Sequence, residues 1–156
     1  MEILVRKVQP EDAPALAALL RSIGWFRRMQ NEPVETTAQL VRQQLDQCLS
    51  QGSHTVYVAE EAEAGLIGYV AVHWLPYLFL AGPEGFISDL FIHESGRGQG
   101  LGSRLLKVVI EEAKDRGCVR LQLINFRSRE SYQRGFYSKA GWQERPDGAS
   151  FVYYLE

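Results

Sequence analysis

A cluster of glycines between a strand-like segment and a helix-like segment is the feature that most constrains this chain. Residues 86–93, FISDLFIH, have the apolar and β-branched character of a strand, and residues 95–106, SGRGQGLGSRLL, pass directly from glycine-rich sequence into an amphipathic helix. Glycine costs about 1 kcal/mol relative to alanine in regular structure. The backbone here must therefore gain something that side chains would prevent.

The order strand, glycine-rich turn and helix is typical of anion binding. The first amides of a helix have no partner within it, and its N-terminus carries a partial positive charge that favours a phosphate group. Two common phosphate motifs do not fit: the dinucleotide pattern G-x-G-x-x-G would need glycine at Leu101 or Ser103, and the P-loop pattern needs a lysine where this chain has none. The pattern that fits is R-x-x-G-x-G, at residues 97–102.

The rest of the sequence predicts one α/β domain over residues 1–156. Its hydrophobic content of 46% and charged content of 23% are ordinary for a globular protein. Apolar, β-rich runs predict strands at 2–8, 54–60, 65–75, 86–93, 118–124, 142–145 and 150–156. Helical periodicity predicts helices at 11–25, 33–50, 101–116 and 128–140. Asp12 is the expected cap of the first helix. This order predicts a mixed sheet with helices packed on it and a β-α-β unit at its centre.

Composition excludes several classes of function. The formal net charge of −2 gives no basic field to attract nucleic acid or a membrane surface, and no apolar run approaches the ~18 residues of a membrane span. Cys48 and Cys118 are far apart in unrelated contexts, so we expect free thiols and a reducing, cytoplasmic location. His54, His73 and His93 lack zinc-ligand spacing with these cysteines, so no metal site is expected.

The motif at 97–102 resembles the acyl-CoA pyrophosphate loop of the GNAT superfamily of N-acetyltransferases. The likeness continues through DLFIHESGRGQGLGSRLL at 89–106 and GFYSKAGW at 135–142, and the order of the earlier elements is similar as well. The resemblance implies a GNAT-like acyl-CoA N-acyltransferase fold over the whole chain, with a mixed, mostly antiparallel central sheet and flanking helices. It also implies that strands 86–92 and 118–124 are parallel and splay apart to admit acetyl-CoA as co-substrate.

Cofactor contacts follow from the resemblance residue by residue. Backbone amides of the glycine loop are expected to hold the pyrophosphate of acetyl-CoA; they belong to Arg97, Gly98, Gln99, Gly100, Leu101, Gly102 and Ser103. Phe91 and Ile92 fall where the family's strand bonds the pantetheine arm, and a main-chain N–H there would polarise the thioester carbonyl. Both side chains also suit a plain sheet core, and the two roles are compatible because the expected contacts are made by the backbone.

The same resemblance assigns two residues late in the chain. Tyr137 falls on the tyrosine that protonates the departing CoA thiolate, which a phenol of pKa about 10 can do for a thiol of pKa about 8.5. Aromatic residues at helical spacing are more often core, but Tyr137 stands one residue off the stripe formed by Tyr132 and Phe136. The family often has asparagine where this chain has Glu130, and Asn125 at the nearby strand end is the candidate to replace it.

The acceptor side has one leading candidate residue. Asp89 is an acidic residue between apolar neighbours on a central strand, and regular alternation places its side chain with those of Ile87 and Phe91. It is expected to bind an ammonium group or to receive its proton through water, although a carboxylate satisfied by backbone or arginine also fits the sequence. Glu84 and His73 are the weaker candidates for contacts with the same substrate.

Residues 74–92, WLPYLFLAGPEGFISDLFI, are loosely similar to the corresponding stretch of the spermidine/spermine acetyltransferase branch. This similarity favours a small amine or polyamine as the acceptor. The expected activity is therefore an acyltransferase reaction, in which a primary amine of a small molecule attacks acetyl-CoA directly within a ternary complex.

Several alternatives stay open at the level of sequence. The chain could bind acyl-CoA as a sensor without transferring anything, or could acetylate a protein or peptide amine. Residues 125–137, NFRSRESYQRGFY, interleave arginines with aromatics as some nucleic-acid surfaces do, but the acidic overall balance speaks against a nucleic-acid partner. No membrane partner is expected, and a homodimer is left open because family members often dimerise.

Overall fold

The structure is a computed structural model that describes residues 2–155. The chain divides into two compact units, one ending at Gln122 and the other beginning at Leu123. The single domain predicted over residues 1–156 would require the two units to function together, and it stays a prediction.

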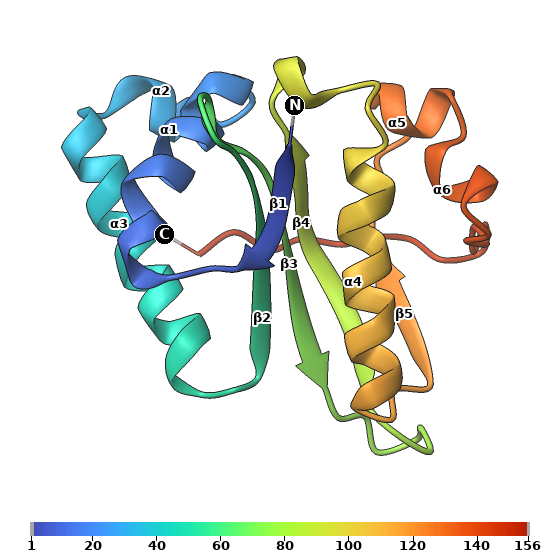
Figure 1. The fold of residues 1–156 in the computed structure, drawn as a ribbon. Helices are drawn as coiled ribbons and strands as arrows, with labels where there is room; N and C mark the ends of the chain where they lie inside the picture. Colours follow the sequence, from blue (N-terminus) through green and yellow to red (C-terminus); the bar gives the residue numbers. More distant parts are fainter. Residues whose placement is uncertain (1, 156) are drawn as a thin grey trace. The chain divides into compact units, whose positions relative to one another are not determined.

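The first unit is built around a sheet with helices on both of its faces (Figure 1). Its strands are β1 (Ile3–Lys7), β2 (His54–Glu61), β3 (Gly65–Leu75), β4 (Glu84–Ile92) and β5 (Arg120–Leu123), the last of which ends at the border with the second unit. Its helices are α1 (Ala13–Ile23), α2 (Arg27–Asn31), α3 (Val34–Ser50) and α4 (Leu101–Asp115), with short 3-10 turns η1 (Pro10–Asp12) and η2 (Glu94–Gly96). Every element that the sequence predicts in this part is present, and α2 is an addition.

The five strands lie in the order β1-β2-β3-β4-β5. Strands β1 to β4 pair antiparallel, and β5 runs parallel to β4. This is the mixed, mostly antiparallel sheet that the sequence predicts, and β4, α4 and β5 form its β-α-β unit. The β3–β4 register shifts between Ala71 and Val72, which changes the side-chain pattern of β4 near its middle.

Alternation along the strands divides the buried side chains between two faces of the sheet. On one face, here called the α1–α3 face, Tyr69 packs in a core with side chains from α1, α3 and β2; the members are Val8, Ala13, Leu16, Leu19, Leu20, Leu45, Val56 and Val58. On the opposite face lies α4, whose buried residues include Leu101, Leu105, Leu106 and Val109. Each buried leucine or valine contributes about 1.5–3 kcal/mol, so the two layers hold the central strands from both sides.

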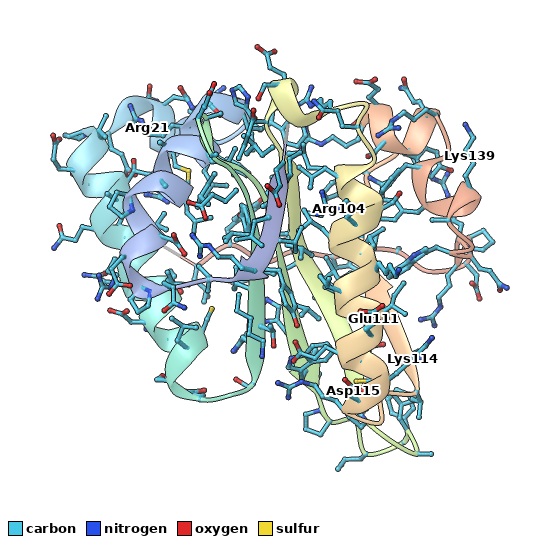
Figure 2. The ribbon with its side chains drawn as sticks, viewed as in Figure 1. Arg21, Arg104, Glu111, Lys114, Asp115 and Lys139 are labelled. Carbon is cyan, nitrogen blue, oxygen red and sulfur yellow. The ribbon has the colours of Figure 1, made fainter. Side chains whose placement is uncertain are left out.

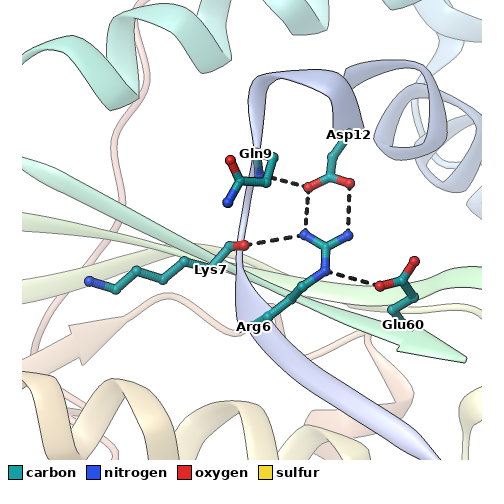
Figure 3. Close-up of polar contacts among 5 residues, drawn as sticks. All are labelled: Arg6, Lys7, Gln9, Asp12 and Glu60. Atoms are coloured by element: carbon teal, nitrogen blue, oxygen red, sulfur yellow. Dashed lines mark hydrogen bonds and ion pairs between the residues drawn. The ribbon is translucent and has the colours of Figure 1, made fainter.

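A polar cluster joins β1, η1 and β2 (Figure 3). The guanidinium of Arg6 donates to both carboxylate oxygens of Asp12, at 2.8 and 2.9 Å, and to Glu60 at 3.0 Å. The carboxylate of Asp12 also accepts the amide of Gln9 at 2.7 Å. Asp12 thus closes the η1 turn and pairs with Arg6, and its side chain does not cap α1 as the sequence predicts. The hydrogen bond from Arg6 lowers the pKa of this carboxyl below its usual value.

The second unit has two short helices where the sequence predicts one. Helices α5 (Glu130–Gln133) and α6 (Phe136–Lys139) are separated at Gly135, whose φ of +68° lies in the left-handed region. That conformation interrupts a right-handed helix and is accepted easily only by glycine. The predicted continuous helix over 128–140 is therefore wrong, and so is the predicted placement of Tyr132 and Phe136 on one helix face.

The end of the chain is also less regular than its composition predicts. Residues 142–155 form no strand within the described part of the chain, so the strands expected at 142–145 and 150–156 are absent as far as residue 155. The apolar side chains of Phe151, Val152, Tyr153, Tyr154 and Leu155 are between 70% and 93% exposed. A strand depends on a neighbour that pairs with its backbone groups, and β-rich composition alone does not supply that neighbour.

Candidate active site

The loop between β4 and α4 adopts, at two positions, a conformation that glycine accepts most easily. Gly98 and Gly100 have φ values of +75° and +74°, and a Cβ added to either would meet no atom within 4 Å. Any other residue would be strained at these two positions, which explains why both are glycine. The missing Cβ atoms also leave the surface of the loop open. Gly96 has a different reason, because its Cβ would come within 3.2 Å of Ile92 Cγ2 where the loop packs onto the sheet.

The turn leaves the first amides of α4 available to a ligand. The first amide of α4 to meet a backbone carbonyl is that of Arg104, which donates to Gly100 O at 3.1 Å. The amides of residues 98–103 donate to no backbone carbonyl in the part of the chain that the structure describes. The amide of Arg97, expected among the pyrophosphate contacts, instead closes η2 by donating to Glu94 O at 3.2 Å. Arg97 and Arg104, both exposed, add positive charge, and Figure 2 marks Arg104 on the first turn of α4. This combination favours an anion such as a diphosphate.

A β-bulge in β4 determines which side chains share a face. Ala71 of β3 pairs with Asp89 while the next residue, Val72, pairs with Ile87, so Ser88 is an extra residue on β4. The extra residue places Asp89 on the α1–α3 face with Phe91 and leaves Ile87 on the face toward α4. The expectation that Asp89 and Ile87 share a face is therefore wrong.

The carboxylate of Asp89 is half-buried and is held by Tyr69. The hydroxyl of Tyr69 donates to Asp89 Oδ2 at 2.6 Å. Burial and the nearby Asp89 raise the pKa of the Tyr69 phenol well above its usual value, so this hydroxyl stays a donor. The ring of Phe91 packs edge-on against Trp25 and Phe26, with centroids 5.7 and 5.5 Å apart. A carboxylate close to aromatic rings suits an ammonium group.

His73 lies on the same face as Asp89. Its Nε2 is 2.7 Å from Ser88 Oγ, and its ring meets that of His54 edge-on at a centroid distance of 4.4 Å. Burial and the charge of His54 lower the pKa of His73, while Asp89 acts in the opposite direction. The structure thus gathers His73, Asp89 and Ser88 on one side of the sheet.

Glu84 lies at the opposite end of β4 from the glycine loop. It stands five residues before Asp89, which corresponds to about 17 Å of strand. Its side chain is fully buried, and Oε1 accepts Arg120 Nε at 2.5 Å. The structure therefore does not bring Glu84 together with Asp89 and His73, and its carboxylate is already engaged by an arginine.

Asn125 and Tyr137 belong to the second unit. Within it, Asn125 Nδ2 donates to Ser131 Oγ at 3.0 Å. The ring of Tyr137, the second residue of α6, meets those of Phe136 and Trp142 edge-on with centroids 4.9 and 5.9 Å apart. Burial raises the pKa of Tyr137 to about 12, so its phenol keeps its proton through the neutral range.

Three contributors to the α1–α3 face have no signal in the sequence. Tyr69 meets Asp89 across 20 positions of the chain, and Trp25 reaches Phe91 from the turn before α2. Ser88 becomes the bulged residue only through the pairing of β3 with β4. Such partners follow from strand register and helix packing, which local periodicity does not encode.

Two further properties concern residues 2–155 as a whole. No group of three or more His, Cys, Asp or Glu side chains among them is arranged to hold a metal ion. None of the helices within this range combines the length and the apolar character needed to cross a bilayer.

Comparison with known proteins gives a consistent family. Residues 20–142 match the model of the acetyltransferase (GNAT) family. A glucosamine 6-phosphate N-acetyltransferase from Oryza sativa subsp. japonica is 30% identical over 126 residues, which cover 79% of this chain and 73% of the relative. A thialysine N-epsilon-acetyltransferase from Bos taurus is 24% identical over 128 residues, covering 78% and 73%.

A solved structure agrees with the fold. The crystal structure of glucosamine-6-phosphate N-acetyltransferase from Arabidopsis thaliana matches this chain with a TM-score of 0.78 at 21% identity and covers 100% of both chains. The family uses acetyl-CoA as co-substrate. Because the matched residues include β4, the glycine loop and the aromatic run that ends at Trp142, this chain belongs to the GNAT family of N-acetyltransferases.

Proposed function

We propose that this enzyme transfers the acetyl group of acetyl-CoA to a primary amine of a small molecule. The observation that carries the proposal is the loop after β4, where glycines in the left-handed region precede amides at the start of α4 that no backbone carbonyl accepts. The amides of residues 98–103 would hold the pyrophosphate, and the side chains of Arg97 and Arg104 would add charge. The pantetheine arm would bind the main chain at Phe91 and Ile92. The Phe91 side chain would not take part, because its ring already packs against Trp25 and Phe26.

The acceptor would bind on the α1–α3 face, where Asp89 pairs with its ammonium group. Tyr69 fixes the position of that carboxylate, and the rings of Phe91 and Trp25 offer apolar contact to the carbon chain. Relatives named for glucosamine 6-phosphate and thialysine support a small amine as the substrate class. At neutral pH an alkylamine of pKa about 10.4 is almost entirely protonated, which adds about 4–5 kcal/mol to the barrier. The site must therefore also dispose of a proton.

The reaction would proceed by direct attack. The amine lone pair forms a C–N bond with the thioester carbonyl carbon, and the C–S bond then breaks to release CoA thiolate. Tyr137 is the proposed donor of a proton to that sulfur, because it occupies the motif position and its phenol is neutral in the physiological range. Asn125 is proposed as a further cofactor contact, and the two units are proposed to act as one cytoplasmic GNAT domain.

The test measures thiol release from acetyl-CoA with glucosamine 6-phosphate, thialysine, spermidine, an aminoglycoside and a peptide with a free N-terminus. We expect the wild type to turn over at least one of the first four, with the acetylated amine confirmed by mass spectrometry. Asp89→Asn should raise KM for the amine, and Tyr137→Phe should lower kcat by about 10²-fold with unchanged affinity for CoA. Asp46→Asn, which changes an exposed carboxylate on α3 paired with Arg42, is the matched control.

The outcomes separate the alternatives. Binding of acetyl-CoA without thiol release for any amine would favour a sensor, and turnover of the peptide alone would favour a protein or peptide acceptor. Failure to bind CoA at all would remove the basis of the proposal.

A further inference from the structure

Histidines and serines from three regions of the sheet form a continuous polar cluster on the α1–α3 face. Ser88 Oγ lies 2.7 Å from His73 Nε2, and the His73 ring meets His54 at a centroid distance of 4.4 Å. His54 Nδ1 lies 2.8 Å from Ser53 Oγ. These contacts lead from the bulge beside Asp89, across β3, to the first residue of β2.

The position of the cluster makes it more than a structural contact. Ser88 is exposed and both histidine rings are half-exposed, so the chain of groups reaches solvent at both ends. Ser88 is also the extra residue of the β-bulge and directly precedes Asp89, the residue proposed to hold the acceptor. An ammonium group paired with Asp89 would therefore stand close to the Ser88 hydroxyl.

The surroundings of His73 keep its ring neutral, so that it has a free nitrogen to accept a proton. His54 faces the His73 ring from β2, and Asp89 faces it from β4. On α3, Cys48 lies close enough to Asp89 for this carboxylate to raise the pKa of the Cys48 thiol. Burial and His54 lower the pKa of His73, and the opposing effect of Asp89 is smaller. The ring is consequently neutral near pH 7, and two histidines in contact disfavour holding two protons at once.

We propose that Ser88 and His73 form a proton relay that deprotonates the acceptor ammonium held at Asp89, after which the half-exposed His73 ring releases the proton to solvent. This inference rests on the proposed function. The ammonium gives a proton to Ser88 Oγ while the Ser88 hydroxyl proton moves to His73 Nε2, which leaves a free amine and an imidazolium. The amine then forms the C–N bond and the C–S bond breaks. The nitrogen loses its second proton as the thiolate gains one, and the imidazolium releases its own proton to solvent.

The first measurement does not require an acceptor. An NMR titration of the three histidine rings in the unliganded protein should show one ring with a pKa below the usual 6.5 that disappears in His73→Gln. In His54→Asn, the pKa of His73 should move upward, because one of the two causes that lower it has been removed. A His73 pKa that ignores the loss of His54 would contradict the coupling on which the relay depends.

The second measurement is the pH dependence of kcat for the amine of the panel that is turned over fastest. In the wild type, kcat should rise with pH through the pKa of His73 and then level off. His73→Gln should lower kcat by about 10²-fold and abolish this rise, and Ser88→Ala should lower kcat without changing KM for acetyl-CoA. The control is His93→Gln, since His93 Nδ1 and Ser95 Oγ form a second such pair at 2.8 Å outside the cluster. This variant should keep the wild-type rise.

The two proposals fail in different ways. If acetylation occurs but His73→Gln, folded as judged by thermal unfolding, keeps both kcat and the wild-type pH profile, the relay is wrong and the proposed function stands. If the wild type acetylates no amine, both are wrong, whatever the histidine titration shows.

Discussion

Replacing Gly100 by alanine tests the two separate reasons for the glycine loop. The φ of Gly100 is +74°, where an L-residue costs about 1–2 kcal/mol. Alanine also restricts the unfolded chain, which returns about 0.4–1 kcal/mol, so we expect a net loss of about 1 kcal/mol of unfolding free energy. For a chain of this size that loss corresponds to a decrease of about 2–4 °C in Tm.

The effect on CoA should be larger than the effect on stability. The added Cβ meets no protein atom within 4 Å, so it projects into the open space proposed for the diphosphate. Displacing the ligand from one charge-assisted hydrogen bond loses about 1.5–3 kcal/mol, or about 10–100-fold in Kd. Isothermal titration calorimetry with CoA and differential scanning fluorimetry measure the two quantities separately.

Gly117 offers the matched control at the other end of α4. Its φ is +72° and its Cβ would likewise meet nothing within 4 Å, so Gly117→Ala carries the same backbone strain. Tm should decrease by the same amount in both variants, and only Gly100→Ala should bind CoA more weakly than the wild type. Equal CoA affinity in wild type, Gly100→Ala and Gly117→Ala would show that the glycine serves the turn alone and would refute the binding role of the loop.

Three further changes test other contacts. Tyr69→Phe removes the hydroxyl that holds Asp89 at 2.6 Å and should cost about 1.5–3 kcal/mol in chemical denaturation, with a raised KM for the amine; an unchanged KM would separate Asp89 from acceptor binding. Arg120→Met leaves the fully buried Glu84 carboxylate without its arginine and should cost about 3–5 kcal/mol, most of which Glu84→Gln in the same chain should restore; additive losses would contradict the pairing. Asp12 has a pKa lowered by Arg6, so its stabilising effect is present above the usual carboxyl pKa and is lost as the pH falls through the folded-state value. The stability difference between wild type and Asp12→Asn should therefore shrink from about pH 5 to pH 2, and a constant difference would show that the charge of Asp12 does not matter.

The parts of the fold that the sequence predicts are those with strong local signals. Strand β3 and helix α4 carry long, regular apolar periodicity, and the glycines between β4 and α4 mark a turn that side chains would strain. These signals act over a few neighbouring residues, which is why the amino-acid sequence alone is enough to place the glycine loop and the helix that follows it.

The remaining features depend on contacts between distant residues. The bulge at Ser88 is a shift of one residue in the register between β3 and β4. The letters ISDL do not reveal this shift, because they read as an ordinary strand. The break at Gly135 escapes prediction because a single glycine inside a helical pattern is often tolerated. The segment FVYYL at 151–155 has strand composition, but pairing requires a partner strand that composition does not specify.

The single surplus residue in β4 has an evolutionary consequence. Deleting Ser88 from the gene would leave Ile87 opposite Val72 and Asp89 opposite Ala71 as direct neighbours in a regular strand. Both side chains would keep their present faces, and only the Ser88 hydroxyl would be lost. A lineage could thus lose the proposed relay serine by a three-nucleotide deletion and still keep Asp89 in place for the acceptor. Comparisons among relatives of this enzyme should therefore track the length of this strand as closely as its amino-acid identities.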